Sequence, residues 1–121
     1  MSTIETANKL REAAELIGEN GHTIGTYQDA KGQLCLHGAL AKAHGLGAEA
    51  VYADEVTESM NALIRVLPDR CSDPKCKGNR VADGKLYEED IVYHYNDFHC
   101  DGGAGAIEVL VQAAEKIEAD L

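Results

Sequence analysis

Apolar residues recur at intervals of three and four positions in several separate stretches of this chain. The first stretch, residues 4–17, places Ile, Ala and Leu on one helical face and leads to Asn20 and Gly21, a pair that commonly ends a helix. Ser2 and Glu5 have the spacing of a capping box at its start. A face of this period must be buried against another element, so a largely helical fold is expected.

Three further stretches have the same period. A compact second helix is expected over residues 35–44, and a third over residues 54–67, with Asp54 as its cap and Pro68 after its end. A fourth helix is expected from about Gly105 onward, with its glutamates facing outward. Its expected inward residues are Ile107, Leu110, Val111, Ala114 and Ile117.

The remaining segments do not have a helical period. Residues 22–34 contain the turn-like stretch 29–32 and predict a small hairpin, while residues 91–95 predict a short strand or an extended lead-in. Residues 68–90 are polar and poor in aliphatic side chains, which predicts a surface loop. The expected fold class is therefore α+β and predominantly α: about four helices in one domain, residues 1–121, with a small two- or three-stranded β element.

Size and composition limit the class of protein. A chain of 121 residues can bury one core, and with five Tyr, one Phe and no Trp that core must consist mostly of Ala, Leu, Ile and Val. The N-terminal residues contain no basic region, and no apolar run approaches the roughly 20 residues of a membrane span. A cytoplasmic protein without a membrane partner is expected.

The net charge of −10 disfavours a nucleic-acid partner, because binding to phosphates depends largely on Lys and Arg. Residues 69–85 hold five basic and three acidic side chains, a local balance of +2 that leaves −12 for the rest. The acidic remainder could mimic DNA, but keeping the protein soluble is the commoner role of such charge.

Residues 93–103 are richer than any other segment in side chains that bind metals, move protons or hold ligands. A catalytic hypothesis pairs them with Cys35, which stands at a predicted helix N-terminus where positive potential favours a thiolate. His94 or His99 would then be the base, and Asn96 or Asp97 would orient it.

A structural interpretation of the same residues competes with catalysis. Cys35 would be a small buried apolar residue, as free cysteines often are. Asn96 and Asp97 would hold the glycine-rich turn 101–105 by hydrogen bonds to backbone amides. No Walker lysine accompanies those glycines, so nucleotide binding is not expected.

Four cysteines also suggest a metal site. Cys71 and Cys76 are separated by four residues, and His94, His99 and Cys100 could complete a tetrahedral zinc site that orders a polar loop. A disulfide between Cys71 and Cys76, or free thiols, are the alternatives. The two histidines of the second helix are expected in the core or on the surface and not as ligands: His37 and His44.

Aromatic residues gather ahead of the last helix and predict a binding surface. Tyr93, Tyr95 and Phe98 could form an exposed patch that docks on another protein, since aromatic side chains are efficient interface anchors. The alternative is that they fill a core otherwise made of small aliphatic residues.

Three short elements carry a resemblance to a known family: residues 21–25, residues 35–40 and residues 95–97. In order, they resemble the Gly-Trp-x-x-Gly-like, Cys-x-x-Gly-Ala-Leu and Trp-Asn-Asp elements of an uncharacterised family of small proteins from actinobacteria and their bacteriophages. His22 and Tyr95 stand where that family usually has Trp. The resemblance implies a fold and an origin but no mechanism.

With the origin that the resemblance implies, the expected protein is a small acidic accessory protein of a phage or an actinobacterium. It would act as a protein-interaction module, with a host protein or a second copy as partner, without catalysis and without a cofactor. A small Cys/His-dependent hydrolase or transferase using Cys35, or a zinc-stabilised binding protein, are the alternatives. Relative to the resembled family, residues 71–80 look like an insertion.

Overall fold

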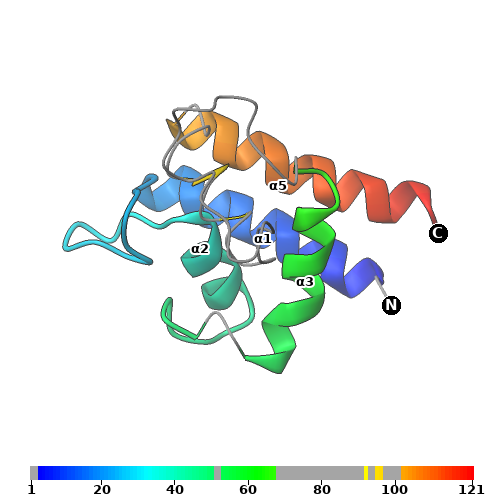
Figure 1. The fold of residues 1–121 in the computed structure, drawn as a ribbon, viewed down its shortest axis with the longest axis horizontal. Helices are drawn as coiled ribbons and strands as arrows, with labels where there is room; N and C mark the ends of the chain where they lie inside the picture. Colours follow the sequence, from blue (N-terminus) through cyan, green and yellow to red (C-terminus); the bar gives the residue numbers. More distant parts are fainter. Residues whose placement is uncertain (1–2, 51–52, 68–91, 93–94, 97–101) are drawn as a thin grey trace, which may run out of the picture.

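A computed structural model describes residues 3–50, 53–67, 92, 95–96 and 102–121. These residues contain four helices: α1 (Ile4–Asn20), α2 (Leu36–Ala43), α3 (Asp54–Ile64) and α5 (Gly102–Ala119). Figure 1 shows α1 and α5 side by side in opposite directions, with α2 and α3 packed against them. The prediction of a predominantly helical fold is confirmed.

The start of α1 differs from the predicted capping box. The side chain of Thr3, and not of Ser2, is the cap: its Oγ1 accepts the backbone N–H of Thr6 at 3.2 Å. The predicted end is confirmed, because Gly21 has a φ of 95° and donates its N–H to Ile17 O at 2.8 Å. A left-handed φ at this position favours glycine.

The second helix is short and approaches its neighbours closely. Cys35 caps it, with Sγ accepting the Gly38 N–H at 3.3 Å, and Gly45 follows its end with a φ of 79°. A Cβ atom on Gly38 would overlap the carbonyl oxygen of Tyr27. Glycine at this position therefore allows the loop before α2 to lie against the helix.

The third predicted helix is present but ends at Ile64 instead of residue 67, and the fourth is present with an earlier beginning. Ala53 occupies the cap position of α3 and no side-chain cap bond is formed, so the prediction of Asp54 as cap is wrong. Asp54 and Glu55 instead lie in the first turn, where carboxylates stabilise the helix dipole. α5 begins at Gly102, three residues before the predicted Gly105.

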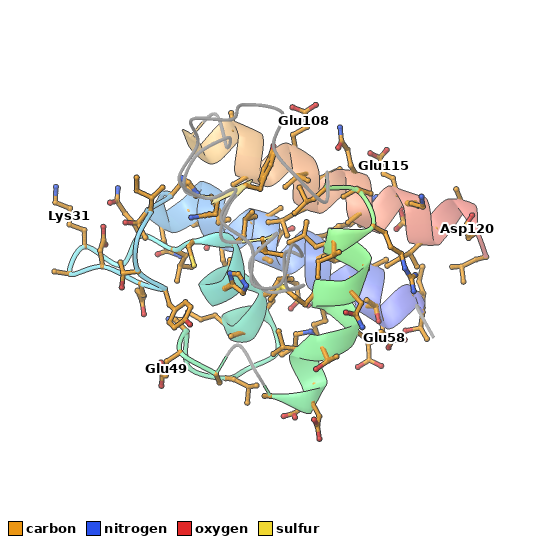
Figure 2. The ribbon with its side chains drawn as sticks, in the orientation of Figure 1. Lys31, Glu49, Glu58, Glu108, Glu115 and Asp120 are labelled. Carbon is orange, nitrogen blue, oxygen red and sulfur yellow. The ribbon has the colours of Figure 1, made fainter. Side chains whose placement is uncertain are left out.

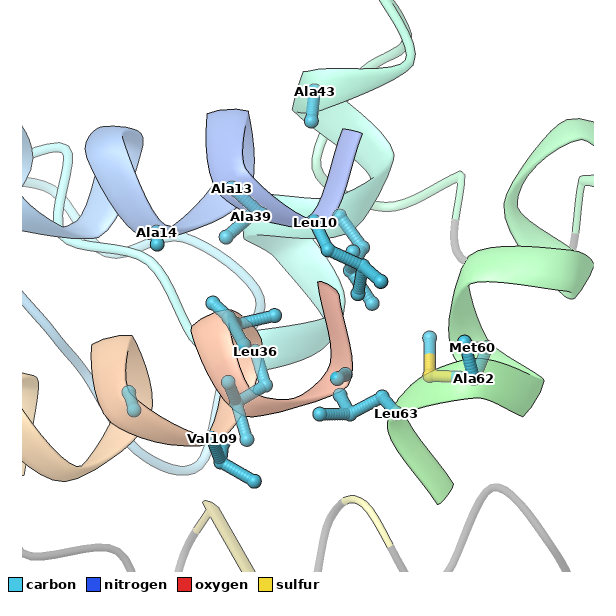
Figure 3. Close-up of a cluster of buried hydrophobic side chains, with 14 of the residues drawn as sticks. Leu10, Ala13, Ala14, Leu36, Ala39, Ala43, Met60, Ala62, Leu63 and Val109 are labelled. Atoms are coloured by element: carbon cyan, nitrogen blue, oxygen red, sulfur yellow. The ribbon is translucent and has the colours of Figure 1, made fainter. Parts of the chain in front are cut away.

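The core is made of aliphatic side chains from all four helices, as the scarcity of aromatic residues predicted (Figure 3). Its largest fully buried members include Leu10, Leu36, Leu63 and Leu110. On α5 the buried face is Ala106, Val109, Leu110, Ala113, Ala114 and Ile117, whereas Ile107 and Val111 are only half-buried. None of the helices in the described residues is long and apolar enough to cross a membrane.

The predicted hairpin is not a sheet. Over the described ranges no strand is formed, and the pairing is limited to two isolated bridges, His22 with Leu34 and Gln28 with Leu34. The predicted turn is present, since the Asp29 carboxylate accepts the Gln33 N–H at 2.9 Å. The predicted hairpin is wrong because the loop bonds to its own turn and, through Tyr27 O, to the N–H of Cys35, the cap of α2, instead of extending a ladder.

The prediction of a strand or extended segment at residues 91–95 is also wrong for the residues that are described there. Val92 has helical backbone, and Tyr95 lies with Asn96 in a π-helical turn. Val92 is fully buried in the core. The predicted surface loop, residues 68–90, lies outside the described residues.

Candidate functional site

The side chain of Asn96 joins two segments that are far apart in the sequence. It is 2% exposed, and its Oδ1 accepts the backbone N–H of Leu36 at 3.0 Å. Its Nδ2 donates to the backbone oxygen of Thr23 at 3.2 Å, and its Oδ1 also lies 2.7 Å from Nε2 of His22. One amide thus connects α2 with the loop that follows α1.

The backbone partners determine which way the amide faces. Leu36 N–H can only donate and Thr23 C=O can only accept, so the Asn96 oxygen must face Leu36 and the nitrogen must face Thr23. Because that oxygen is an acceptor, Nε2 of His22 must carry a proton. In the neutral ring, Nδ1 then holds the lone pair.

Cys35 lies at the same helix terminus but is used as a cap. It immediately precedes Leu36, is 3% exposed, and accepts the Gly38 N–H through Sγ. This bond satisfies one of the first N–H groups of α2, which have no partner within the helix. The sulfur therefore stabilises the helix start.

The last helix packs against the same place. A Cβ on Gly103 would lie 3.6 Å from Cβ of His22 and 3.8 Å from Cγ2 of Ile17, both ordinary contact distances. The end of α1 and the starts of α2 and α5 thus meet around one cluster. We call this cluster the Asn96 joint and define it as His22, Thr23, Cys35, Leu36 and Asn96.

The structure brings together Cys35 and Asn96 of the predicted catalytic residues. Sequence reasoning did not select His22, the imidazole that bonds to Asn96; its only signal was its place in the Gly-rich element of residues 21–25. Tyr95, predicted for binding, is half-buried and packs on the core. The other predicted site residues lie outside the described residues: Cys71, Cys76, Tyr93, His94, Asp97, Phe98, His99 and Cys100.

The two histidines of the α2 region contact other residues of the fold. His37 is buried and meets the Tyr27 ring edge-on, with centroids 6.3 Å apart. Nε2 of His44 lies 2.8 Å from the hydroxyl of the buried Ser59, and burial, followed by the nearby Lys9, lowers the pKa of His44. In the described parts of the chain, no three His, Cys, Asp or Glu side chains are arranged to hold a metal.

Among the described residues, two surface hollows lie along α3. The acidic cleft, about 480 Å³, separates the N-terminal end of α1 from α3 and is lined by Thr3, Glu5, Thr6, Lys9, His44, Glu55 and Glu58. The apolar notch, about 60 Å³, lies between the ends of α3 and α5 and is lined by Ala62, Arg65, Ala113, Lys116, Ile117, Asp120 and Leu121. Neither hollow includes a residue of the Asn96 joint.

Comparison with known proteins identifies a family. No match to the chain was found among curated proteins or among solved structures. A model of a family of unknown function, DUF6197, matches residues 1–116, almost the whole chain. The chain therefore belongs to the DUF6197 family.

Proposed function

We propose that this chain is a non-catalytic protein-interaction module: a small acidic accessory protein that acts in the cytoplasm of an actinobacterium or of a phage-infected host. Its partner is a host protein or a second copy of the chain. The observation that carries the proposal is the use of Cys35 and Asn96, the two described candidates for catalysis, in holding the fold.

The hydrogen bonds of the Asn96 joint support a structural role. An amide that orients a catalytic imidazole needs only one bond to the ring, whereas Asn96 also bonds to Leu36 N–H and Thr23 O. Both backbone groups belong to segments that the amide holds together. Such a fully bonded, buried amide favours one arrangement of the chain.

The alternative of a hydrolase or transferase requires Cys35 to attack a substrate. Its sulfur accepts the Gly38 N–H and is almost fully covered, so attack would require opening of the start of α2. The zinc alternative depends on Cys71 and Cys76, with His94, His99 and Cys100 as further ligands. All of these residues lie outside the described ranges, so zinc binding stays a prediction.

Thiol reactivity separates the module from the enzyme. The folded chain would be treated with iodoacetamide near neutral pH and each cysteine followed by peptide mass spectrometry. We expect Cys35 to react at least about 100-fold more slowly in the folded chain than in urea. Fast, selective alkylation of Cys35 in the folded chain would contradict the proposal.

Partner capture tests whether the chain binds another protein, as the proposal requires. The chain and a Tyr93→Ala/Phe98→Ala double variant would serve as baits in an actinobacterial lysate. Ile24→Ala is the matched control, because Ile24 is an exposed aliphatic side chain in a different loop. We expect at least one protein to be retained by the chain and by Ile24→Ala but lost by the double variant. The captured protein, once purified, should also bind the purified chain.

A further inference from the structure

The two hollows follow one helical stripe of α3. Glu55 and Glu58 line the acidic cleft, while Ala62 and Arg65 line the apolar notch. Their spacing of three, four and three residues places them on one side of the helix, over about 15 Å at 1.5 Å per residue. One edge of α3 therefore changes from acidic to basic along its length.

The acidic end carries an exposed aliphatic side chain. Ile4, the first residue of α1, is 53% exposed and precedes Glu5, which lines the acidic cleft. Figure 2 shows Glu58 on the side of α3 next to the N-terminal end of α1, and the Thr6 hydroxyl donates to it at 3.4 Å. Lys9, which also lines this cleft, has its Nζ 3.4 Å from Glu12 Oε2.

The other end has the complementary chemistry. The apolar notch has a floor of Ala62, Ala113 and Ile117, each of which is buried. Arg65 and Lys116 line its rim together with Asp120 and Leu121. In a chain of net charge −10, this is a hollow suited to an aliphatic side chain beside a carboxylate.

We infer that this edge binds a second copy of the chain, with the α3 stripes antiparallel across a two-fold axis. In that arrangement the Ile4 and Glu5 end of each copy covers the apolar notch of the other, and the glutamates face Arg65 and Lys116. The inference rests on the proposed function and adds to it a surface for self-association, separate from the aromatic residues Tyr93 and Phe98.

Charge distribution favours a second copy over an unrelated partner. A purely basic partner would be repelled by Arg65 and Lys116, and a purely acidic one by the glutamates of the acidic cleft. A two-fold axis matches both ends at once, because it places each end opposite its complement. Repulsion between the net charges of two copies is screened over about 8 Å at physiological salt.

Charge exchange tests the inference. The mass of the full chain would be measured by light scattering and sedimentation from about 5 µM to about 500 µM in about 150 mM salt. We expect a dimer that Lys116→Glu or Glu5→Lys weakens about tenfold or more, and that the double variant largely restores. Lys42→Glu, an equal charge change on an exposed residue of α2 that lines neither hollow, should leave the dimer unchanged.

A monomer at every concentration would overturn the inference. A dimer that neither single variant weakens would overturn it as well, because its contact would lie elsewhere. Neither result touches the proposed function, which partner capture by the Tyr93 and Phe98 baits tests separately. The inference is supported if each single variant dimerises more weakly while staying folded by circular dichroism, and if the double variant recovers the dimer.

Discussion

The side-chain oxygen of Asn96 accepts the backbone N–H of Leu36 at 3.0 Å, across sixty positions of sequence. This N–H is among the first of α2, which no carbonyl of the helix can satisfy. Cys35 satisfies another such group, that of Gly38. The start of a short, buried helix is thus bonded by two side chains, one local and one distant.

Asn96→Ala should destabilise the fold by about 3 kcal/mol. The change leaves Leu36 N–H and Thr23 O buried without the amide that satisfies them, and an unsatisfied buried group costs about 1–3 kcal/mol. Urea unfolding followed by circular dichroism measures the difference. Asn20→Ala is the control: Asn20 is exposed and bonds only within its own helix turn, so a change below about 0.5 kcal/mol is expected.

The neutral ring of His22 should carry its proton on Nε2. The orientation of the Asn96 amide leaves only an acceptor opposite that nitrogen, 2.7 Å away. A long-range proton–nitrogen correlation spectrum above neutral pH distinguishes the two ring nitrogens directly. A proton on Nδ1 would mean that the Asn96 joint is bonded differently in solution, and Asn96→Ala should allow both tautomers.

Gly38→Ala should destabilise the chain although alanine is the better helix former. A methyl group at this position would overlap the carbonyl oxygen of Tyr27, and overpacking of this kind costs about 1–3 kcal/mol. Gly18→Ala in α1 makes the same chemical change with only an ordinary contact, 3.7 Å to Ile107 Cδ1. It should stabilise by about 0.5–1 kcal/mol, so thermal melting of the two variants should shift in opposite directions.

Cys35→Ser and Cys35→Ala separate capping from simple burial. Serine retains an atom that accepts the Gly38 N–H, whereas alanine does not, and loss of a cap costs about 1 kcal/mol. We expect the alanine variant to be less stable than the serine variant in urea unfolding. Equal stabilities, or a more stable alanine variant, would show that Sγ contributes through burial alone.

Stability should fall as the pH drops below neutrality because of His44. Burial lowers the pKa of this histidine in the folded chain, so the unfolded chain takes up the proton first. The fold therefore loses stability from the unfolded pKa of about 6.5 down to the folded pKa, and no further below it. Urea unfolding between about pH 7.5 and about pH 5.5 should show this slope, and His44→Gln should reduce it.

The carboxylate of Glu118 contributes to the change of folding stability at more acidic pH. Arg11 donates to Glu118 at 2.6 Å, and this hydrogen bond is the main reason that the pKa of Glu118 is lowered. A lowered carboxyl pKa contributes stability above the unfolded value that is lost as the pH falls through the folded value. Glu118→Gln should therefore alter the pH dependence of the unfolding free energy only well below the pH range in which His44 takes up its proton.

The helices could be predicted because their evidence is local. The apolar period of residues 4–17 and the Gly21 stop define α1, and α2 was predicted within one residue at each end. The N-terminal cap of α1 is harder to predict, because Ser2 and Thr3 both carry a hydroxyl. Only the backbone conformation selects Thr3. The prediction of a hairpin over residues 22–34 is wrong because alternation of apolar and polar residues over a few positions does not specify a partner strand.

The sequence by itself determined that this chain forms amphipathic helices around a core of small aliphatic residues, because periodicity and composition act within one element. Only the tertiary structure decided what Cys35, Asn96 and His22 do. Their roles depend on which polar groups lie nearby, and those groups come from segments up to seventy-four residues away. The same packing set Glu55 and Arg65 along two different hollows of one edge, a juxtaposition that no local pattern encodes.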